Sequence, residues 1–300
     1  MQYEQLVSLP NPDKLSAKHS VKVAHHISSK IKSAGGQISF GEFMHEALYS
    51  QGLGYYNTGL TKFGRDGDFI TAPEVSAIFG RVLAEQCNEV LNQIENGEIL
   101  EFGAGSGKLS IDILLGLEEK KSLPLTYNIF EISPDLIQRQ KNKLNIEIPH
   151  LVDRVKWLSE IPSNFEGVVI ANEVLDALPV ERFIKRRFGI SQMFVSLNED
   201  EFVWTEKKAS DHLIKEVVAI EEEIDRGLTY GYQSEICLAA PQWIADLESY
   251  LRYGVVFLFD YGVSRREYYA IDRNDGWLRC HYRHHAHDNP LVLPGIQDLT

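Results

Sequence analysis

Residues 98–107, which read Glu-Ile-Leu-Glu-Phe-Gly-Ala-Gly-Ser-Gly, constrain the fold of this 300-residue chain more than any other stretch. An apolar strand is expected to end at Glu101, glycines follow at positions 103, 105 and 107, and an amphipathic run begins at Leu109. Glycine lets a backbone approach a ligand closely, and the start of a helix offers free N–H groups. This order of strand, glycine-rich turn and helix therefore predicts an α/β fold with a nucleotide-like cofactor at the turn.

The spacing of the glycines separates two classes of cofactor. A dinucleotide fingerprint reads G-x-G-x-x-G, and Lys108 stands where its third glycine would fall. An acidic residue followed by x-G-x-G-x-G is instead the form that S-adenosylmethionine (SAM) methyltransferases use. The second landmark of that class, an acidic residue that ends the next strand and can bind both ribose hydroxyls, is present as Glu131. A nicotinamide oxidoreductase is disfavoured, and a tight turn that binds no cofactor is the lesser alternative.

Composition restricts the partners of the chain. The net charge of −13 disfavours general nucleic-acid binding, which needs a basic surface, and is compatible with a basic protein or peptide substrate. The three cysteines are widely spaced, which predicts a reducing compartment and no disulfide framework. No apolar run reaches the length of about 18 residues that a membrane span needs, and no secretory signal is seen. We expect a cytoplasmic location in a bacterium, or the mitochondrial matrix in a eukaryote.

Hydrophobic periodicity divides the chain into expected elements. Before the glycine turn it predicts a helix over 16–35, a short strand at 38–40 followed by a helix, a long loop over 51–72, and one helix from Pro73 through Leu83. After the turn it predicts strands at 155–158, 168–172 and 255–261. An insertion of about 80 residues precedes the last of these strands. It contains an expected hairpin over 192–205, a helix near 211–226, a strand near 234–239 and a helix at 241–252.

These elements predict a Rossmann-like fold, a mostly parallel twisted sheet flanked by helices, with an N-terminal helical extension and a large insertion before the fifth strand. Residues 1–72 are expected to form the N-terminal helical extension and a lid loop. Residues 73–300 are expected to form the methyltransferase core, with the insertion at about 180–250.

Four motifs in a fixed order make the prediction more specific. They are Gly-Asp-Phe-Ile-Thr-Ala-Pro-Glu-Val-Ser at 67–76, Glu-Phe-Gly-Ala-Gly-Ser-Gly at 101–107, Asn-Glu-Val-Leu-Asp-Ala-Leu-Pro-Val at 172–180, and Phe-Asp-Tyr-Gly at 259–262. With these motifs, roughly residues 15–300 resemble the MidA family of SAM-dependent methyltransferases. That family includes a mitochondrial assembly factor that methylates an arginine on a subunit of respiratory complex I. Its members usually continue past residue 300, so the C-terminal strands of the core are expected to be absent.

In a doubly wound sheet the ligand lies beyond the carboxyl ends of the strands. We therefore expect Glu101 and the glycine turn to hold the methionine part of the cofactor, Glu131 to bind the ribose, and Leu158 and Ser159 to flank the adenine. The full set of expected cofactor-binding residues is Thr71, Glu101, Gly103, Ala104, Gly105, Gly107, Glu131, Leu158, Ser159 and Asn172. Resemblance further implies that residues 59–71 form a lid over the cofactor.

Carboxylates are the expected catalytic groups. A guanidinium is cationic and poorly nucleophilic, so methylation of arginine needs carboxylates that bind it and accept its proton. The candidates are Glu74, Glu173 and Asp176, with Glu235 as a weaker fourth. A structural role at the start of a helix fits Glu74 and Asp176 equally well, and Asn172 with Glu173 also reads as a helix cap.

Two other functions remain open at this point. The chain could be a non-catalytic assembly factor that keeps a SAM-binding fold, or a small-molecule methyltransferase whose insertion caps the substrate. Arginine as the acceptor rests on the resemblance alone. The histidine-rich stretch 280–288 matches no structural zinc spacing, and we expect it to be a solvated loop with no metal. The basic run 185–187 is expected to be an exposed strand face.

Overall fold

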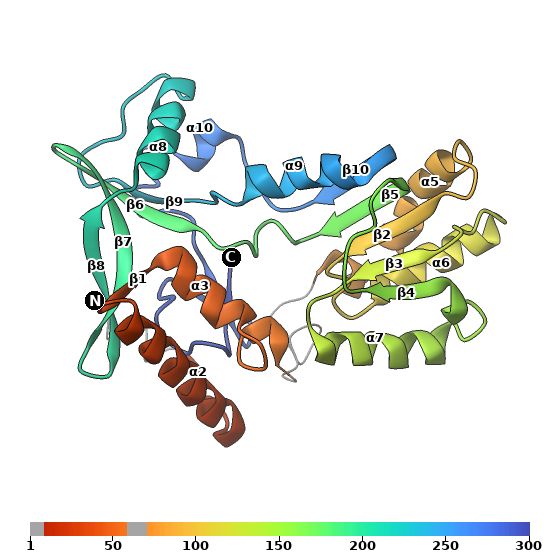
Figure 1. Ribbon diagram of the computed structural model, residues 1–300, viewed down its shortest axis with the longest axis horizontal. Coiled ribbons are helices and arrows are strands. Elements are labelled where there is room, and N and C mark those ends of the chain that lie inside the picture. Colours follow the sequence, from red (N-terminus) through yellow and green to blue (C-terminus); the bar gives the residue numbers. More distant parts are fainter. Residues whose placement is uncertain (1–8, 59–70) are drawn as a thin grey trace. The chain divides into compact units, whose positions relative to one another are not determined.

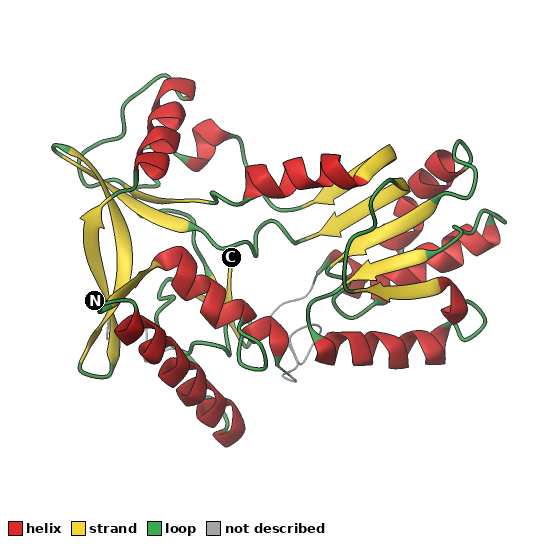
Figure 2. Ribbon diagram, viewed as in Figure 1, coloured by secondary structure: helices red, strands yellow, loops and turns green. Residues whose placement is uncertain are grey.

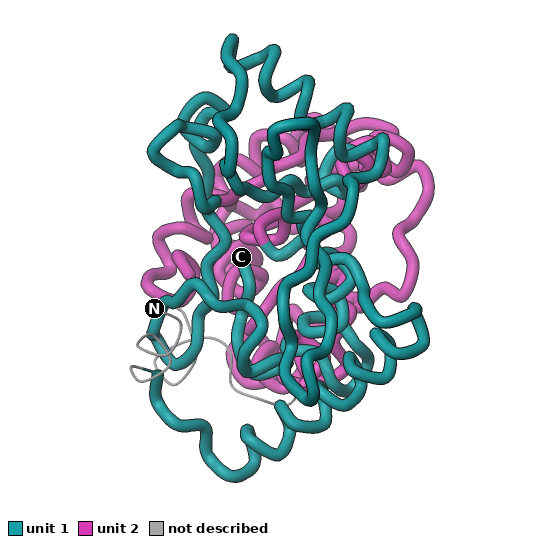
Figure 3. Tube along the Cα trace, turned by 90° about the vertical axis from the view of Figure 1, so that its left-hand side faces the viewer, with its two compact units in different colours: residues 1–55, 177–241, 261–300 teal, residues 56–176, 242–260 magenta. Residues whose placement is uncertain are grey.

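The computed structural model describes residues 9–58 and 71–300 (Figure 1). Helices and strands alternate over residues 78–158, and several strands then follow one another up to residue 208 (Figure 2). The chain forms two compact units (Figure 3). Unit 1 contains residues 1–55, 177–241 and 261–300, and unit 2 contains residues 56–176 and 242–260. The N-terminal segment, most of the insertion and the C-terminal segment thus belong to one unit.

Unit 2 is built on a parallel five-stranded sheet with the order β10-β5-β2-β3-β4 (Figure 1). Its strands are β2 (Glu98–Phe102), β3 (Tyr127–Phe130), β4 (Val155–Leu158), β5 (Phe165–Asn172) and β10 (Leu251–Phe259). Their apolar residues run almost without interruption, as expected for strands covered on both faces. The predicted strands at 155–158 and 168–172 are confirmed, and the strand predicted at 255–261 begins and ends earlier than expected.

Helices cover both faces of this sheet. On one face α5 (Ile78–Leu91), α6 (Lys108–Glu119) and α7 (Pro134–Glu147) pack onto side chains that include Ile99, Ile129 and Ile170. On the other face Leu247 and Trp243 of α9 (Ala240–Tyr250) pack onto Leu100, Phe102, Val169 and others. Neighbouring residues of β2 and β5 thus contribute to opposite faces, as the two-residue period of a strand requires. A short 3-10 turn, η2 (Val152–Arg154), leads into β4.

The single helix predicted from Pro73 is in fact two. Helix α4 (Ala72–Val75) ends where Ser76 adopts an extended backbone, with φ −158° and ψ 141°. Helix α5 then begins at Ile78, whose N–H donates to the Ser76 hydroxyl at 3.2 Å. A serine side chain that bonds to a nearby backbone N–H favours a helix start over a helix interior, which explains the break.

Unit 1 contains an antiparallel sheet with the order β1-β7-β6-β9, and β8 pairs with the free side of β7. Its strands are β1 (Gln37–Ser39), β6 (Glu181–Arg186), β7 (Gly189–Asn198), β8 (Glu201–Lys208) and β9 (Gln233–Ile236). The accompanying helices are α2 (Lys14–Ser33), α3 (Phe40–Tyr49), α8 (Asp211–Glu223) and α10 (Arg265–Tyr268), and η1 (Tyr55–Asn57) follows α3. The predicted hairpin and the helices near 16–35 and 211–226 are confirmed, and β6 contains Lys185 and Arg186 of the basic run that was expected on a strand face.

The expectation that C-terminal strands are absent is wrong. Residues 280–299 form β11 (Cys280–Tyr282), β12 (His285–His287) and β13 (Asp298–Leu299), an antiparallel sheet with the order β12-β11-β13. The stretch 280–288 is accordingly a hairpin and not the solvated loop that its histidines suggested. Cys280, Tyr282 and His287 are buried, because alternate residues of a strand face the interior.

Candidate active site

The glycine turn, residues 103–107, joins β2 to α6 at the carboxyl edge of the parallel sheet. Gly103, Gly105 and Gly107 have φ angles of 61°, 53° and 79°, in the left-handed region that favours glycine. Gly103 is exposed, while Ala104 between the first two glycines is buried. A turn of this kind exposes backbone at a helix N-terminus, where it can contact a polar ligand.

Gln140 fixes this turn from behind. Its side chain is completely buried, and its Nε2 donates to the Gly105 carbonyl at 2.9 Å and to Glu131 Oε2 at 3.2 Å. Its Oε1 accepts from Trp157 Nε1 at 2.8 Å. One amide therefore links the glycine turn, the ends of β3 and β4, and helix α7. The sequence reasoning missed Gln140, although a polar residue between Leu136 and Leu144 on a buried helix face was a signal for it.

Glu131 lies immediately after β3, next to the glycine turn. Its Oε1 accepts the backbone N–H of Ser133 at 3.0 Å, while its Oε2 accepts from Gln140. Ser133 in turn caps α7 by accepting from Leu136 N at 3.4 Å. The carboxylate is half-buried and held in one orientation, as a group that binds two vicinal hydroxyls needs to be.

Glu101 is buried beneath the turn, with 2% of its surface exposed. Its Oε2 accepts from the Ser110 hydroxyl at 2.6 Å and from the Tyr127 hydroxyl at 2.7 Å, which ties β2 to α6 and β3. Burial raises the pKa of this carboxyl to about 7, although both hydroxyl hydrogen bonds lower it. These contacts support the turn from inside the protein, and the expected contact with the methionine part of the cofactor stays a prediction.

Glu74 is brought to the glycine turn by α4. Its carboxylate accepts a hydrogen bond from the Ser106 hydroxyl, and Lys143 Nζ donates to the same hydroxyl at 3.4 Å. Thr71 precedes α4 as its N-cap residue without a side-chain hydrogen bond to the helix. The lid expected over 59–71 falls, except for Thr71, outside the residues that the structure describes.

The residues after β5 form a second turn, residues 173–176, which we call the β5 turn. Glu173 has a φ of 52°, and its N–H donates to the Phe259 carbonyl at 2.8 Å. Asn172, the last residue of β5, is paired in register with Phe259. Asp260 Oδ2 accepts the N–H groups of Leu175 and Asp176 at 2.9 and 3.1 Å. Asp260 belongs to the motif at 259–262, but its role as the anchor of this turn could not be read from the sequence.

The β5 turn lies close to the glycine turn. A Cβ added at Gly103 would lie 3.4 Å from Val174 Cγ2, so a side chain at the first glycine would meet Val174. Asn172, Glu173 and Asp176 are half-buried. Leu158 ends β4 at the same edge of the sheet, half-buried, and Ser159 after it is exposed.

This edge of the sheet is rich in carboxylates and suits a cationic ligand. Five carboxylates belong to the residues just described, namely Glu74, Glu131, Glu173, Asp176 and Asp260. The left-handed glycines curve the backbone of the glycine turn, and Glu131 follows the end of β3 beside it. A SAM molecule carries a sulfonium cation, a ribose diol and a zwitterionic methionine, and the residues present match each of these groups.

Glu235, the fourth catalytic candidate, belongs to unit 1 and is 2% exposed. Its carboxylate accepts from Arg182 Nε at 3.1 Å and from Trp277 N at 2.9 Å. Burial raises its pKa, and Arg182 opposes that rise. The Glu235 carboxylate thus joins β6, β9 and the loop around Trp277, and the Glu235 carbonyl accepts from the Tyr269 hydroxyl at 3.0 Å.

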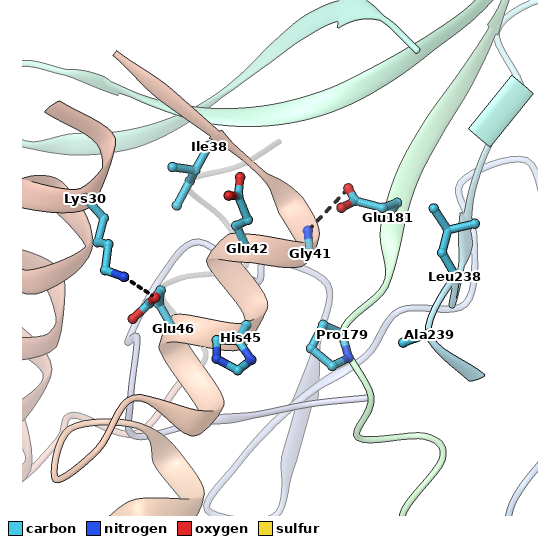
Figure 4. Close-up of a pocket in the computed structure, with 10 residues that line it drawn as sticks. All are labelled: Lys30, Ile38, Gly41, Glu42, His45, Glu46, Pro179, Glu181, Leu238 and Ala239. Carbon is cyan, nitrogen blue, oxygen red and sulfur yellow. Dashed lines mark hydrogen bonds and ion pairs between the residues drawn. The ribbon is translucent and has the colours of Figure 1, made fainter. Parts of the chain in front are cut away.

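Unit 1 also has a pocket of about 480 Å³, lined from α3, β1, β6 and the segment after β9 (Figure 4). The carboxylates that line this pocket form ion pairs and hydrogen bonds within unit 1. Glu46 pairs with Lys30 at 2.9 Å, Glu42 completes the capping box of α3 with Ser39, and Glu181 accepts from Ser39 Oγ at 2.7 Å. Gly41 lies close to Glu181, because a Cβ there would lie 2.6 Å from Glu181 Oε1 and would displace this carboxylate.

In residues 9–58 and 71–300, no group of three or more histidine, cysteine, aspartate or glutamate side chains is arranged to hold a metal ion. None of the helices in these described residues has the length and apolar character needed to cross a membrane. The three cysteines are free. In the basic run 185–187, Lys185 pairs with Glu221 at 2.6 Å and Arg186 pairs with Glu206.

Comparison with known proteins identifies the family. A family model described as "Putative S-adenosyl-L-methionine-dependent methyltransferase" matches residues 82–300. A crystal structure of a COG1565 superfamily member from Burkholderia thailandensis, bound to S-adenosyl-homocysteine, superposes with a TM-score of 0.91 at 37% identity and covers 98% of this chain and 76% of that one. This chain belongs to the MidA family of SAM-dependent methyltransferases.

Curated members of the MidA family are more distant in sequence. The "Protein arginine methyltransferase NDUFAF7, mitochondrial" of Danio rerio is 28% identical over 323 residues, which cover 95% of this chain and 70% of that protein. The Caenorhabditis elegans homologue is 26% identical over 325 residues, which cover 100% of this chain and 73% of that protein. The cofactor of this MidA family member is SAM.

Proposed function

We propose that this protein transfers the methyl group of SAM to an arginine side chain of a protein substrate. The observation that carries the proposal is the proximity of the β5 turn, which contains Glu173 and Asp176, to the glycine turn. Membership of the MidA family supports methyl transfer, and the names of the curated relatives support arginine as the acceptor.

Each part of the edge has an assigned task in this proposal. The glycine turn, with Ala104 and Thr71 nearby, holds the methionine part of SAM, and Glu131 accepts hydrogen bonds from the ribose hydroxyls. Leu158 and Ser159 flank the adenine, and Asn172 lies toward the methyl group. Bound SAM supplies an electrophilic methyl group on its sulfonium. The protein's contribution is to align the acceptor nitrogen with that group and to exclude water.

The carboxylates make a guanidinium competent as an acceptor. Glu173 binds the guanidinium through charge-assisted hydrogen bonds and receives the proton that the methylated nitrogen releases. Asp176 and Glu74 add negative charge on either side and favour the cationic acceptor over a neutral one. A subunit of respiratory complex I as the substrate protein follows from the family resemblance and remains a prediction, as does a mitochondrial or cytoplasmic location.

A methyl-transfer assay tests the proposal. Purified protein with radiolabelled SAM is offered arginine-containing peptides and the same peptides with lysine in place of arginine, and the products are hydrolysed for amino-acid analysis. We expect label in methylarginine, lost by about two orders of magnitude in Glu173→Gln, as removal of an acid–base group costs. Glu166→Gln is the matched control, because Glu166 lies on β5, the strand that leads into Glu173, and forms an exposed ion pair with Arg252.

Other outcomes of this assay point to the other functions. Binding of S-adenosylhomocysteine without methyl transfer to any peptide or protein would favour a non-catalytic assembly factor. Transfer to small amines or hydroxyl compounds alone would favour a small-molecule methyltransferase. Label in methyllysine would keep protein methylation and reject arginine.

A further inference from the structure

Asp260 anchors the β5 turn through two adjacent backbone groups. Its Oδ2 accepts from Leu175 N at 2.9 Å and from Asp176 N at 3.1 Å, although these residues are 85 and 84 positions away in the sequence. Asp260 follows β10, and the parallel register pairs Phe259 with Asn172 at the end of β5. The carboxylate therefore reaches across from one strand end to the turn that follows the neighbouring strand.

The turn that Asp260 holds contains a strained residue. Glu173 has a φ of 52°, in a region that residues with a Cβ rarely adopt. Such a conformation persists only when the surroundings determine it, and strain of this kind is concentrated at functional sites. The bonds that determine it are the one from Glu173 N to the Phe259 carbonyl, at 2.8 Å, and the two that Asp260 accepts.

The same turn lies close to the glycine turn. Val174, between the strained residue and the two anchored N–H groups, lies 3.4 Å from the Cβ position of Gly103. Val174 also packs with the cluster that contains Leu100 and Phe102 of β2. A shift of the β5 turn would therefore move Val174 relative to Gly103. It would also displace Glu173, which belongs to the same turn.

We propose that Asp260 is a positioning residue of the SAM site, which holds the β5 turn so that Glu173 keeps its left-handed conformation and Val174 supports Gly103. Asp260 acts through backbone N–H groups and needs no contact with cofactor or substrate. The part of this inference that concerns Glu173 rests on the proposed function, whereas the part that concerns the support of the glycine turn does not.

The first experiment distinguishes a role of Asp260 in positioning the SAM site from a role in stability alone. Asp260→Ala removes the acceptor, Asp260→Asn keeps an oxygen that can accept both N–H groups, and Asp246→Ala is the control, an exposed aspartate of α9. In Asp260→Ala we expect the amides of Leu175 and Asp176 to exchange hydrogen about tenfold faster or more, and S-adenosylhomocysteine to bind about three- to tenfold more weakly. Asp260→Asn is expected to stay within about threefold of the wild type in both measurements.

A second experiment tests whether Asp260 acts through the strained residue. Glycine adopts a positive φ without strain, so in a Glu173→Gly background the turn needs less help from Asp260. We expect Asp260→Ala to weaken S-adenosylhomocysteine binding by a factor at least about twofold smaller in that background than in the wild type. An equal factor in both backgrounds would overturn the action through Glu173.

The inference as a whole is overturned if Asp260→Ala lowers the melting temperature but leaves S-adenosylhomocysteine affinity and the exchange of the two amides unchanged. If Asp260→Ala does not fold, the change is made in the Glu173→Gly background, where the turn needs less help from Asp260, and unchanged exchange of the two amides relative to Glu173→Gly overturns the inference. Failure of the proposed function is seen separately, as the absence of methylarginine in the wild-type assay, because none of these readouts needs an acceptor.

Discussion

Glu101 in unit 2 and Glu235 in unit 1 are equally buried, at 2% exposure each, but are stabilised in opposite ways. Glu235 has a cationic partner, Arg182, and a backbone N–H from Trp277. Among the residues that the structure describes, the Glu101 carboxylate accepts hydrogen bonds from the neutral hydroxyls of Ser110 and Tyr127. The difference shows that equal burial can go with different electrostatic roles. The ion pair of Glu235 joins parts of unit 1, whereas Glu101 lies under the glycine turn without a cationic partner among the described residues.

The largest expected effect is on the ion pair of unit 1. Glu235→Ala leaves the Arg182 guanidinium and the Trp277 N–H buried without this acceptor, so we expect the free energy of unfolding to fall by about 3–5 kcal/mol. Urea denaturation at pH 7 measures this loss. Asp275→Asn is the matched control, because Asp275 is the exposed partner of the same arginine, 78% accessible, and its loss is expected to cost about 1 kcal/mol or less. Similar losses in the two variants would contradict the role given to burial.

The second prediction concerns the pH dependence that Glu101 imposes. Its pKa is raised from 4.5 to about 7 in the folded protein, so the folded state keeps a proton that the unfolded state releases between these values. The stabilisation is fully present below pH 4.5 and is lost as the pH rises to about 7, by on the order of 3 kcal/mol. Glu101→Gln cannot titrate and keeps an acceptor for both hydroxyls. We expect its stability relative to the wild type to increase from pH 5 to pH 7 and then to level off, measured by urea denaturation across that range.

A flat difference between the two proteins over that range would contradict the raised pKa. The same series on Glu235→Gln sharpens the comparison, because that variant should be destabilised at every pH in the range by the loss of the Arg182 pair.

The third prediction compares two left-handed glycines, one in each unit. Gly107 and Gly231 have φ angles of 79° and 85°, and either substitution by alanine is expected to cost about 1–2 kcal/mol in the free energy of unfolding. At Gly107 the new Cβ also lies 3.1 Å from Leu144 Cδ1, whereas nothing lies within 4 Å at Gly231. Calorimetry with S-adenosylhomocysteine should show weaker binding for Gly107→Ala only. Equal loss of affinity in both variants would contradict the assignment of the cofactor to the glycine turn.

The smallest effect is expected at the unit 1 pocket. Hydrogen bonds from Ser50, Lys30 and His26 hold the pKa of Glu46 at about 2, against the opposing effect of partial burial. This stabilisation is present above pH 4.5 and is lost as the pH falls toward 2, which is the reverse of Glu101. Since the site is partly exposed and screened, Glu46→Gln is expected to cost about 1 kcal/mol at pH 7 and less at pH 3. Thermal unfolding at the two pH values tests this, and an increasing loss at low pH would contradict it.

The sequence by itself determined the parallel sheet, the glycine turn and the acidic residue at the next strand end. Each of these depends on local patterns: apolar strands such as 168–172, glycines at fixed spacing, and one residue, Glu131, directly after a strand. The motifs around Asn172 and Phe259 also led to the MidA family, which the comparisons confirm. Conformation within a few residues is decided by steric preference and hydrophobic period, and both can be read from the chain.

Only the tertiary structure decided which groups act on the turns. Gln140 bonds to Gly105 across 35 positions and Asp260 to Leu175 across 85, and no local pattern contains such pairs. The same reason explains the corrected elements: Ser76 ends α4 early, and residues 280–299 become strands by pairing with one another. It also explains why residues 1–55, 177–241 and 261–300 form one unit. Hydrogen bonds and packing between distant segments depend on the folded positions of those segments. Local sequence patterns do not specify these positions.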